Sequence, residues 1–333
     1  RSTLSPSSAA SDVYKRQIPY WSMIPALTSS KEEREQVAVI PRIFASTAWL
    51  IMGTFGLSIV KKLGNGNVVK GYSSFAVVIA VAFIISAIIT CLNVKERVET
   101  PKNAEKVSFK QTLNIIRKND QLVVFIGIVL GMNLIMQISG SMAIYYFTYV
   151  VGKESLFSVY QAFAGIAEIS GLVLLPILTK KIGREDVFKF GSILPIAGFL
   201  LLFVAGIVAP QNALFIGMAG AILKLGSGFL LGSTTIMLAD VVDYGEFKLG
   251  TRNESIVFSV QTLLVKGASA VAGWLVGVGL SLVGYVAGEV QSATTILGMR
   301  VIMIWIPIVC AIVMYTIYTV SYTHLTLPTT ERV

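Results

Sequence analysis

Lys266 is the residue of this chain whose position most strongly suggests chemistry. It lies in a stretch, residues 256–287, that contains no other charged side chain. An ammonium inside a bilayer is costly, and such groups usually face a bundle interior or a water-filled cavity. About ten residues of span precede Lys266 and about twenty follow it, at ~1.5 Å of rise per residue, which is too deep for easy snorkelling to the interface. We therefore expect Lys266 to face a wet, polar cavity.

Hydroxyl groups accompany this lysine on one helix face. The residues Ser255, Ser259, Thr262, Lys266 and Ser269 follow one another at helical spacing, and steps of four and three keep side chains on one side of a helix. The opposite face carries small residues suited to close helix packing, namely Gly267, Ala270, Gly273 and Gly277. Serine and threonine can simply bond back to their own helix carbonyls, but their alignment with a lysine favours a polar pathway.

A second polar face is predicted on the span that follows the longest basic loop. Asn133, Gln137 and Ser141 are spaced by four, and Tyr145 and Tyr146 come one turn later. Amides inside a bilayer need hydrogen-bond partners. They either join neighbouring helices or bind a polyhydroxylated solute, and the sequence leaves both interpretations open.

Other single residues are candidates of the same kind. The C–H face of a pyranose packs on an indole ring, so Trp21 and Trp49 are considered, although tryptophan near an interface is more often a membrane anchor. Glu168 and Lys224 lie near the middle of different spans, where they either pair structurally or line the pathway. Arg300 lies near the outer end of its span, and we expect it to snorkel.

A charged segment lies between two apolar spans, from Asp240 to Glu254. Asp240 and Asp243 stand at the expected end of one helix, whereas Arg252 and Glu254 begin the next. Opposed charges at a hinge can hold a cytoplasmic gate shut and separate on opening. These four residues are the gating candidates.

The composition is that of an integral membrane protein. The chain is 54% hydrophobic and 14% charged, with a mean hydropathy of +0.75, whereas soluble domains have about 25% charged residues. A bilayer core needs about 20 apolar residues per helix. Eight segments meet that length: residues 44–60, 74–92, 122–150, 159–178, 190–209, 214–242, 256–287 and 294–319.

The two cysteines, Cys91 and Cys310, both lie in such spans. We expect their side chains to pack against apolar neighbours rather than to form a disulfide or bind a metal.

Both ends of the chain look foreign to it. Residues 12–17 and 320–324 can be back-translated to reverse complements of one another, and both flanks resemble translated transposase adapter sequence from sequencing libraries. We therefore expect residues 1–17 and 320–333 to be non-native and exclude them from fold reasoning. The single histidine, His324, lies in the excluded part, which argues against a histidine base or metal ligand.

The loops alternate in charge. The intervals 29–43, 93–120, 179–189 and 243–253 hold 16 lysines and arginines, whereas 61–72, 151–156, 208–213 and 287–293 hold 4. The positive-inside rule places the first set in the cytoplasm, and every expected span then crosses once. Lipid headgroups account for the basic charge, so no nucleic-acid partner is expected. Six spans after a long basic loop are typical of a transporter built from two six-helix halves.

An ordered set of motifs resembles one transporter family. The motifs are Pro19-Tyr-Trp-Ser, Pro41-Arg, Asp240-Val-Val-Asp-Tyr-Gly-Glu-Phe-Lys, Arg252-Asn-Glu-Ser and Val260-Gln-Thr-Leu-Leu-Val-Lys-Gly. Together they are similar to the glycoside-pentoside-hexuronide cation symporters of the major facilitator superfamily, and most of all to its melibiose carriers. The similarity runs from Ile18 to Thr319.

The resemblance implies an all-α integral membrane protein with the major facilitator fold. Residues 18–92 would be the remnant of the N-terminal bundle (the end of helix 4, then helices 5 and 6), 93–120 the cytoplasmic central loop, and 121–319 a complete six-helix C-terminal bundle. The implied location is the cytoplasmic (inner) membrane, with multiple passes.

The resemblance also implies roles for particular residues. Trp21 and Arg42 match the sugar-binding or gating region, and Thr262 and Lys266 match residues that line the sugar and cation region. The acidic cation ligands of the family come from helices one, two and four, and we expect none of them in this chain, which would begin just after the fourth-helix acid. A second sugar-site tryptophan of the melibiose carriers aligns with Leu231, which argues against melibiose as the substrate.

The expected function is cation-coupled symport of a glycoside, pentoside or hexuronide by alternating access, driven by sodium or protons. No cofactor is expected beyond the coupling ion; the expected partners are the sugar, a monovalent cation and membrane lipid. The substrate-binding candidates are Trp21, Arg42, Asn133, Gln137, Thr262 and Lys266. Thr262 is also a cation-binding candidate.

An uncoupled sugar facilitator is the nearest alternative function. A non-transporting membrane sensor is another, but the short cytoplasmic loops leave little room for an output domain. An enzyme is not expected, because no histidine or clustered cysteine supplies a catalytic constellation.

Overall fold

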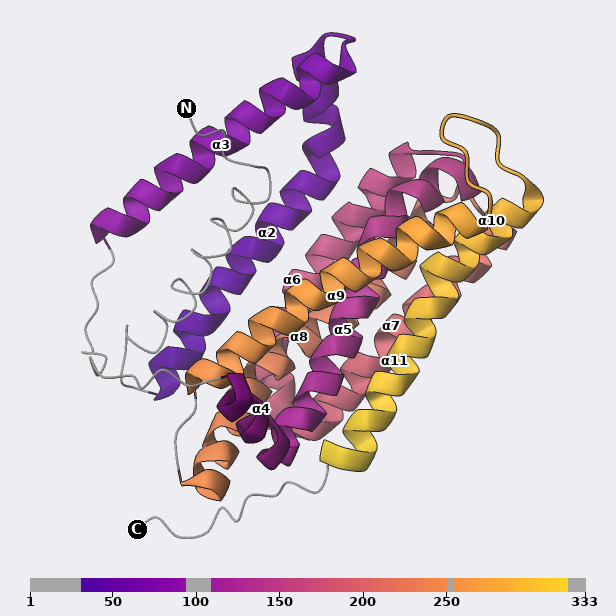
Figure 1. Ribbon diagram of the computed structural model, residues 1–333. Coiled ribbons are helices and arrows are strands. Elements are labelled where there is room, and N and C mark those ends of the chain that lie inside the picture. Colours follow the sequence, from indigo (N-terminus) through magenta and orange to yellow (C-terminus); the bar gives the residue numbers. More distant parts are fainter. Residues whose placement is uncertain (1–30, 94–108, 251–253, 323–333) are drawn as a thin grey trace. The chain divides into compact units, whose positions relative to one another are not determined.

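A computed structural model describes residues 31–93, 109–250 and 254–322, and these residues are almost entirely helical, with no strand among them (Figure 1). Eight of the helices in the described part are long and apolar enough to span a membrane. Backbone N–H and C=O groups have no water to bond inside lipid, and a helix satisfies them internally. This explains why the apolar segments predicted from the sequence form helices.

The described chain forms two compact units. The helix α2 (Lys31–Gly64) is divided between them: its residues 31–42 and 55–64 belong to the smaller unit, together with α3 (Val68–Asn93). The larger unit contains residues 43–54 of α2 and everything from Ser108 on. In the smaller unit, a turn through Asn65 and Gly66 joins the two helices, and Asn67 Oδ1 accepts a hydrogen bond from the Lys70 N–H at 3.0 Å. Gly71 lies against the Val60 backbone, which lets the two helices approach closely.

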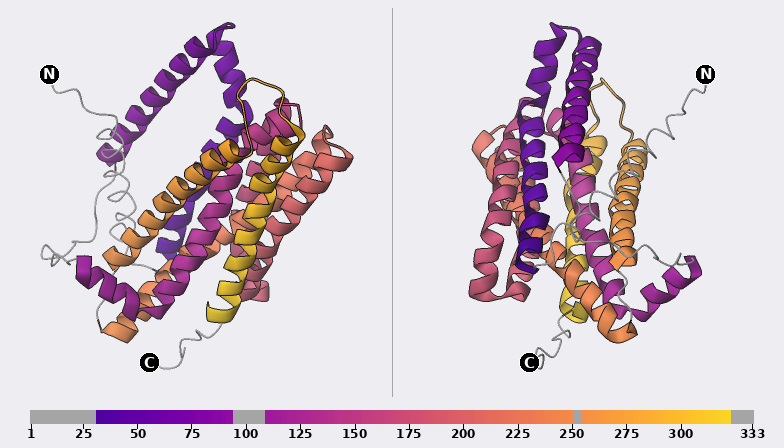
Figure 2. Two further views of the ribbon diagram at one scale, coloured as in Figure 1. Left: turned by 45° about the vertical axis from the view of Figure 1, so that its right-hand side comes forward. Right: turned by 90° about the vertical axis from the view of Figure 1, so that its left-hand side faces the viewer.

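The larger unit contains a bundle of long helices (Figures 1 and 2). Its elements are α4 (Phe109–Lys118), α5 (Asp120–Tyr145), η1 (Tyr146–Val150), α6 (Ser155–Ile182), α7 (Arg184–Val208), α8 (Ala213–Leu249), α9 (Glu254–Leu282), α10 (Ala293–Arg300), η2 (Val301–Trp305), α11 (Ile306–Ile317) and η3 (Tyr318–Tyr322). The three η segments are π-helical, and α10, η2, α11 and η3 form one continuous last span.

Side-chain caps and glycines set several of the helix ends. Asn212 accepts hydrogen bonds from the Leu214 and Phe215 N–H groups at the start of α8, and Ser292 accepts one from the Thr295 N–H at the start of α10. These side chains satisfy N–H groups that have no partner within the helix. Gly250 ends α8 in the left-handed conformation (φ 68°), where glycine is favoured.

Several helices extend beyond the predicted spans, α2 and α8 among them. Lys31–Arg42 is already helical in α2, and α8 continues through Asp243 to Leu249. The α2 extension is rich in glutamate, glutamine, lysine and arginine, which form helices readily outside a membrane. The expected helix end at Asp240 and Asp243 is therefore wrong by about two turns, and the charged segment is mostly helix rather than loop.

The core of the larger unit runs along α5. Its buried side chains include Phe125, Ile128 and Met142, which cluster with apolar residues of α8, α9 and α11. The α6, α7 and α8 helices approach closely at glycines: a Cβ at Gly198 of α7 would lie 2.6 Å from the backbone nitrogen of Leu223 on α8. Small residues at such crossings are typical of helix packing in membranes, where lipid is as apolar as leucine.

Candidate functional site

Helix α9 carries the predicted polar face beside its packing face. Its buried residues Ala268, Ala272, Val276 and Leu280 are spaced by four and belong to the interior of the bundle, where α9 packs mainly against α5. Lys266 and Thr262 are half-buried, next to this packing face. The lysine is therefore neither in the apolar core nor fully exposed.

The hydroxyls of α9 do not all behave alike. Thr262 Oγ1 donates a hydrogen bond to the Phe258 carbonyl at 3.0 Å. This is the bond to its own helix that the sequence analysis raised as the alternative to binding a ligand. Ser259 and Ser269 are exposed, and the side chain of Ser255 lies outside the described residues. The predicted glycine face has no neighbour in the described part of the chain, since a Cβ at Gly267, Gly273 or Gly277 would meet no atom within 4 Å.

Helix α5 presents the amide candidates. Asn133 is buried, and its Nδ2 donates to the Val129 carbonyl of its own helix at 2.8 Å. Gln137 is half-buried one turn later, and Ser141 is exposed. Figures 1 and 2 show α5 and α9 side by side, so the two helices that carry the predicted polar faces are neighbours in the bundle.

Not all of the proposed site residues can be placed. Trp21 and Arg252 lie outside the described residues, and the side chains of Arg42 and Glu254 are likewise not described although both residues are helical. Trp49, which was considered with Trp21, is 74% exposed. The substrate-binding candidates that the structure locates are therefore Asn133, Gln137, Thr262 and Lys266.

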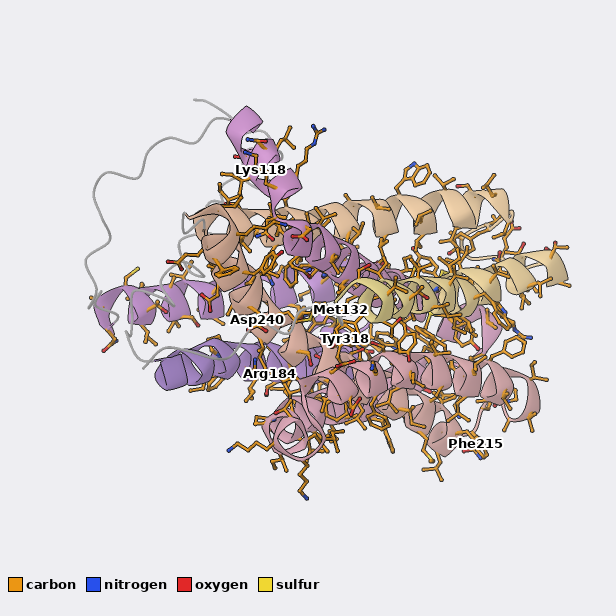
Figure 3. The ribbon with its side chains drawn as sticks, turned by 90° about the horizontal axis from the view of Figure 1, so that it is seen from below. Lys118, Met132, Arg184, Phe215, Asp240 and Tyr318 are labelled. Atoms are coloured by element: carbon orange, nitrogen blue, oxygen red, sulfur yellow. The ribbon has the colours of Figure 1, made fainter. Side chains whose placement is uncertain are left out.

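The gating candidates that the structure locates belong to α8. Asp240 Oδ1 lies 3.7 Å from Arg184 Nη1 at the start of α7, and both side chains are largely exposed (Figure 3). Exposed ion pairs contribute little stability, which suits a contact that must separate. Asp243 also interacts within the structure, and its partner in a gate remains a prediction.

A second charged contact at this end was missed from the sequence. Asp120 Oδ1, at the start of α5, accepts hydrogen bonds from Lys248 Nζ at 2.6 Å and from the Tyr244 hydroxyl at 2.9 Å. Tyr244 and Lys248 are four residues apart within the charged segment. This spacing, which puts two side chains on the same face of a helix, is the only hint of the contact that the sequence offers. Their partner on α5 is more than 120 positions away in the chain, so no local pattern identifies it.

Asn119 also connects the start of α5 to α8, from a buried position. This residue is 2% exposed; its Oδ1 accepts from the Leu122 N–H at 3.0 Å, and its Nδ2 donates to the Val241 carbonyl at 3.3 Å. It therefore caps α5 and ties it to α8. The start of α5 and the end of α8 are therefore connected both by a buried amide and by a surface ion pair.

Glu168 and Lys224 form a direct pair in the middle of their spans. Lys224 Nζ lies 2.8 Å from Glu168 Oε2, and the Ser46 hydroxyl donates to Oε1 of the same carboxylate at 2.9 Å. Side-chain exposure is 12% for the glutamate and 25% for the lysine. The structure therefore supports pairing between these helices; Lys266 is not part of this contact.

Arg300 bonds to the end of a neighbouring helix. Its Nη2 donates to the Gly206 carbonyl at 3.2 Å, and its Nε is buried without a hydrogen-bond partner among the described residues. The guanidinium thus turns toward the last turn of α7, and its position relative to the membrane surface stays a prediction. Helix carbonyls near a C-terminus lack partners within the helix, and this arginine supplies one.

Tyrosines gather at the opposite end of α5. The ring of Tyr285, in the loop after α9, contacts those of Tyr145 and Tyr149 edge-on, with centroid distances of 5.5 and 5.3 Å. The Tyr285 hydroxyl donates to that of Tyr149 at 3.1 Å, and this hydrogen bond, with burial, raises the pKa of Tyr285 to about 12. The phenol is therefore neutral at physiological pH and acts only through hydrogen bonds and packing.

The described residues contain no group of three histidine, cysteine or acidic side chains suited to a metal ion. What they contain is a multi-pass helical bundle with polar side chains at mid-span and charged contacts at one end. These features define a multi-pass membrane protein of the all-helical kind.

Comparison with known proteins identifies the family. The family model described as MFS/sugar transport protein matches residues 14–323, and the chain belongs to that family. It is 32% identical to the isoprimeverose transporter of Lactiplantibacillus pentosus over 88% of this chain and 61% of that protein. It is 28% identical to the raffinose carrier protein of Pediococcus pentosaceus, over 85% and 44%, and 27% identical to the lactose permease of Lactobacillus helveticus, over 92% and 49%.

These matches confirm the predicted family, a group of major facilitator symporters for sugars, and with it the all-α membrane fold. The three relatives are named as transporters, none as an enzyme. The chain spans about three-fifths or less of the length of each of these relatives.

Proposed function

We propose that the transporter to which this chain belongs carries a glycoside, pentoside or hexuronide across the cytoplasmic membrane together with sodium or a proton. The family and the sugar carriers among the relatives support a small sugar as substrate. The observation that carries the proposal is the contact between α5 and α9, which sets the half-buried Lys266 and Thr262 on a helix adjacent to Asn133 and Gln137. An ammonium, a hydroxyl and two amides are the groups that bind sugar hydroxyls and acidic side chains.

Lys266 has the central role in this proposal. Its positive charge balances or competes with the acidic cation ligands expected in helices one, two and four. Arrival of the cation and arrival of the sugar then stabilise the same closed state, which links the two binding events thermodynamically. Alternating access moves the two halves of the transporter around the site, and Asp240, Asp243, Arg252 and Glu254 act in the cytoplasmic gate.

The test is uptake of labelled glycosides by the complete transporter with Lys266→Leu. We expect loss of cation-driven accumulation, with at least a tenfold lower final sugar ratio, because the charge that links the two ligands is removed. Lys153→Leu is the matched control: Lys153 is exposed between η1 and α6, and uptake by this variant is expected to be normal. Unchanged accumulation by the Lys266→Leu transporter would exclude the residue from the mechanism.

An uncoupled sugar facilitator is the second candidate function. Its distinguishing property is that sugar equilibrates without being concentrated, whatever the sodium or proton gradient. Uphill uptake that stops when both gradients are collapsed supports symport. Equilibration at the same rate with and without the gradients would replace symport by facilitation.

A further inference from the structure

The short helix α4 lies directly beside the start of a membrane span. It has ten residues, and only Asn119 separates its last residue, Lys118, from Asp120, the first residue of α5. The Asn119 N–H donates to the Ile115 carbonyl at 3.0 Å, so the chain turns from α4 into α5 through a hydrogen-bonded corner. Because α5 enters the membrane here, α4 must lie close to the membrane surface.

The direction of α4 keeps it near that surface. The right-hand view of Figure 2 shows α4 standing out sideways from the end of the larger unit at which α5 begins. The basic interval 93–120 predicts that this end faces the cytoplasm. A helix with this direction runs along the membrane surface, whereas one that continued the axis of α5 would extend into the cytoplasm.

One side of α4 packs against the bundle, and an apolar side chain remains on the other. Ile115 and Ile116 are half-buried and contact the core of the larger unit. Leu113 is 40% exposed. An isolated helix of this length is marginal in water, and apolar area that stays in water adds no stability. An apolar environment beside Leu113 would therefore stabilise both the side chain and the helix.

Two cationic side chains lie beside this leucine. Arg117 comes four residues after Leu113, and Lys118 four residues after Asn114, so the exposed surface of α4 changes from apolar to cationic around the helix. Arg117 and Lys118 are both exposed, and neither forms an ion pair with another described residue. This order of side chains is typical of a helix that lies in the plane of a lipid surface.

We propose that α4 lies in the headgroup layer of the cytoplasmic leaflet and binds anionic phospholipid. Arg117 binds the lipid phosphate through two N–H groups, Lys118 adds a second positive charge, and Leu113 contacts the first part of the acyl chains. Cations at a helix C-terminus also stabilise the helix dipole, but the dipole does not account for the exposed leucine. The position of α4, one residue from a membrane span, selects lipid over a soluble partner.

Lipid bound to α4 also supports the corner between α5 and α8. Asn119, the single residue between α4 and α5, donates to the Val241 carbonyl of α8. Fixing α4 at the membrane surface restricts the movement of Asn119 and of the helix cap that it forms. This role goes beyond the proposed transport function, because it depends on the lipid and not on the solute or the coupling ion.

Lipid binding tests the surface in the complete transporter, purified in a neutral detergent and titrated with fluorescent phosphatidylglycerol. Arg117→Gln with Lys118→Gln is expected to weaken binding about twentyfold, because each cation near an anionic lipid contributes a factor of about five. Phosphatidylcholine with the same label is the comparison lipid. Equal binding of the two lipids by the unmodified transporter would show that anionic headgroups are not recognised and would contradict the proposal.

The matched control is Lys180→Gln with Lys181→Gln. These two exposed lysines lie in the last turn of α6, in another interval predicted to be cytoplasmic, so the control removes the same charge. Its affinity for phosphatidylglycerol is expected to stay nearly unchanged. Equal weakening by the two double variants would show a diffuse attraction to the basic end of the protein and would overturn the α4 surface.

A depth measurement tests where α4 lies. The cysteine-free transporter is reconstituted in vesicles of phosphatidylcholine and phosphatidylglycerol in equal amounts, with a nitroxide on Leu113→Cys or on Asn114→Cys, about 100° further round the helix. The Leu113 nitroxide is expected to collide more with oxygen, which concentrates among acyl chains, than with a water-soluble nickel chelate. The Asn114 nitroxide is expected to show the reverse, as is one on Val290→Cys, where Val290 is 100% exposed.

Two results of the depth measurement would exclude the membrane position. Collision with the nickel chelate at Leu113→Cys as frequent as at Val290→Cys would place α4 in water. Protection of both α4 nitroxides from both reagents would show that protein covers the helix in place of lipid. Neither readout involves sugar uptake, so failure of this proposal is distinguishable from failure of the proposed transport function.

Discussion

The charged residues inside the bundle differ in how they are compensated. Glu168 and Lys224 neutralise each other directly at 2.8 Å, whereas Arg300 donates to a helix carbonyl at 3.2 Å. Thr262 bonds to its own helix, yet Lys266 lies half-buried beside it. The bundle thus neutralises one charge with an ion pair and another with a helix carbonyl.

The Glu168–Lys224 pair gives a prediction about stability. Replacing Lys224 by Met leaves the Glu168 carboxylate buried without a cation, and removing one partner of a buried pair costs about 3 kcal/mol. We expect a clearly lower midpoint of unfolding in detergent for Lys224→Met. The double variant Glu168→Gln with Lys224→Met is expected to recover most of the loss, because both charges are gone.

Lys189→Met provides the comparison for that measurement. Its partner Glu185 is one turn away on the surface of α7, and such exposed pairs contribute little. Equal destabilisation by Lys224→Met and Lys189→Met would show that the Glu168 pair is not buried in the folded protein.

At the scale of helices, glycine positions decide how closely elements approach. Gly198 of α7 faces the Leu223 backbone of α8, whereas a Cβ at Gly140 of α5 would have no neighbour within 4 Å among the described residues. Both glycines lie inside helices, so their intrinsic effects on helix formation are the same. Any difference between them reports on packing.

We therefore predict opposite effects for two identical substitutions. Gly198→Ala forces a methyl group against backbone atoms that cannot move aside, which costs about 1–3 kcal/mol. Gly140→Ala is expected to be neutral or to stabilise by about 0.5–1 kcal/mol, because alanine is the better helix former. Thermal unfolding in detergent measures both. A stable Gly198→Ala protein would contradict the close α7–α8 crossing.

At the scale of the whole molecule, the charge pattern predicts which side faces the cytoplasm. The interval 179–189 holds four basic residues, and 287–293 holds none. In the structure, α6 and α7 meet at the first interval, and the second lies at the other end of the bundle, in the loop before α10. The two loops must therefore lie on opposite sides of the membrane.

Labelling from one side tests this orientation. In a cysteine-free background, Lys180→Cys is expected to react with a membrane-impermeant maleimide only in inverted vesicles, and Val290→Cys only in intact cells. Both positions are exposed in the structure. The reverse pattern would invert the topology, and labelling of both from one side would contradict the alternation of spans.

The sequence by itself determined the membrane class, the eight spans and the family. These follow from local properties: runs of apolar residues, the charge of adjacent loops and motifs of neighbouring positions. It also located Lys266 and Thr262 on one face of α9, because helical periodicity is local. It did not show where α8 ends, because the helix continues past the membrane through residues that a hydropathy pattern assigns to a loop.

Only the tertiary structure decided which residues meet. Glu168 pairs with Lys224 across 56 positions, Ser46 reaches Glu168 across 122, and Asp120 meets Lys248 across 128. A helical pattern shows which side chains share a face, but the direction of that face is set by rotation of the helix against its neighbours. Packing at glycines and buried apolar side chains fixes that rotation, and it involves residues far apart in the chain.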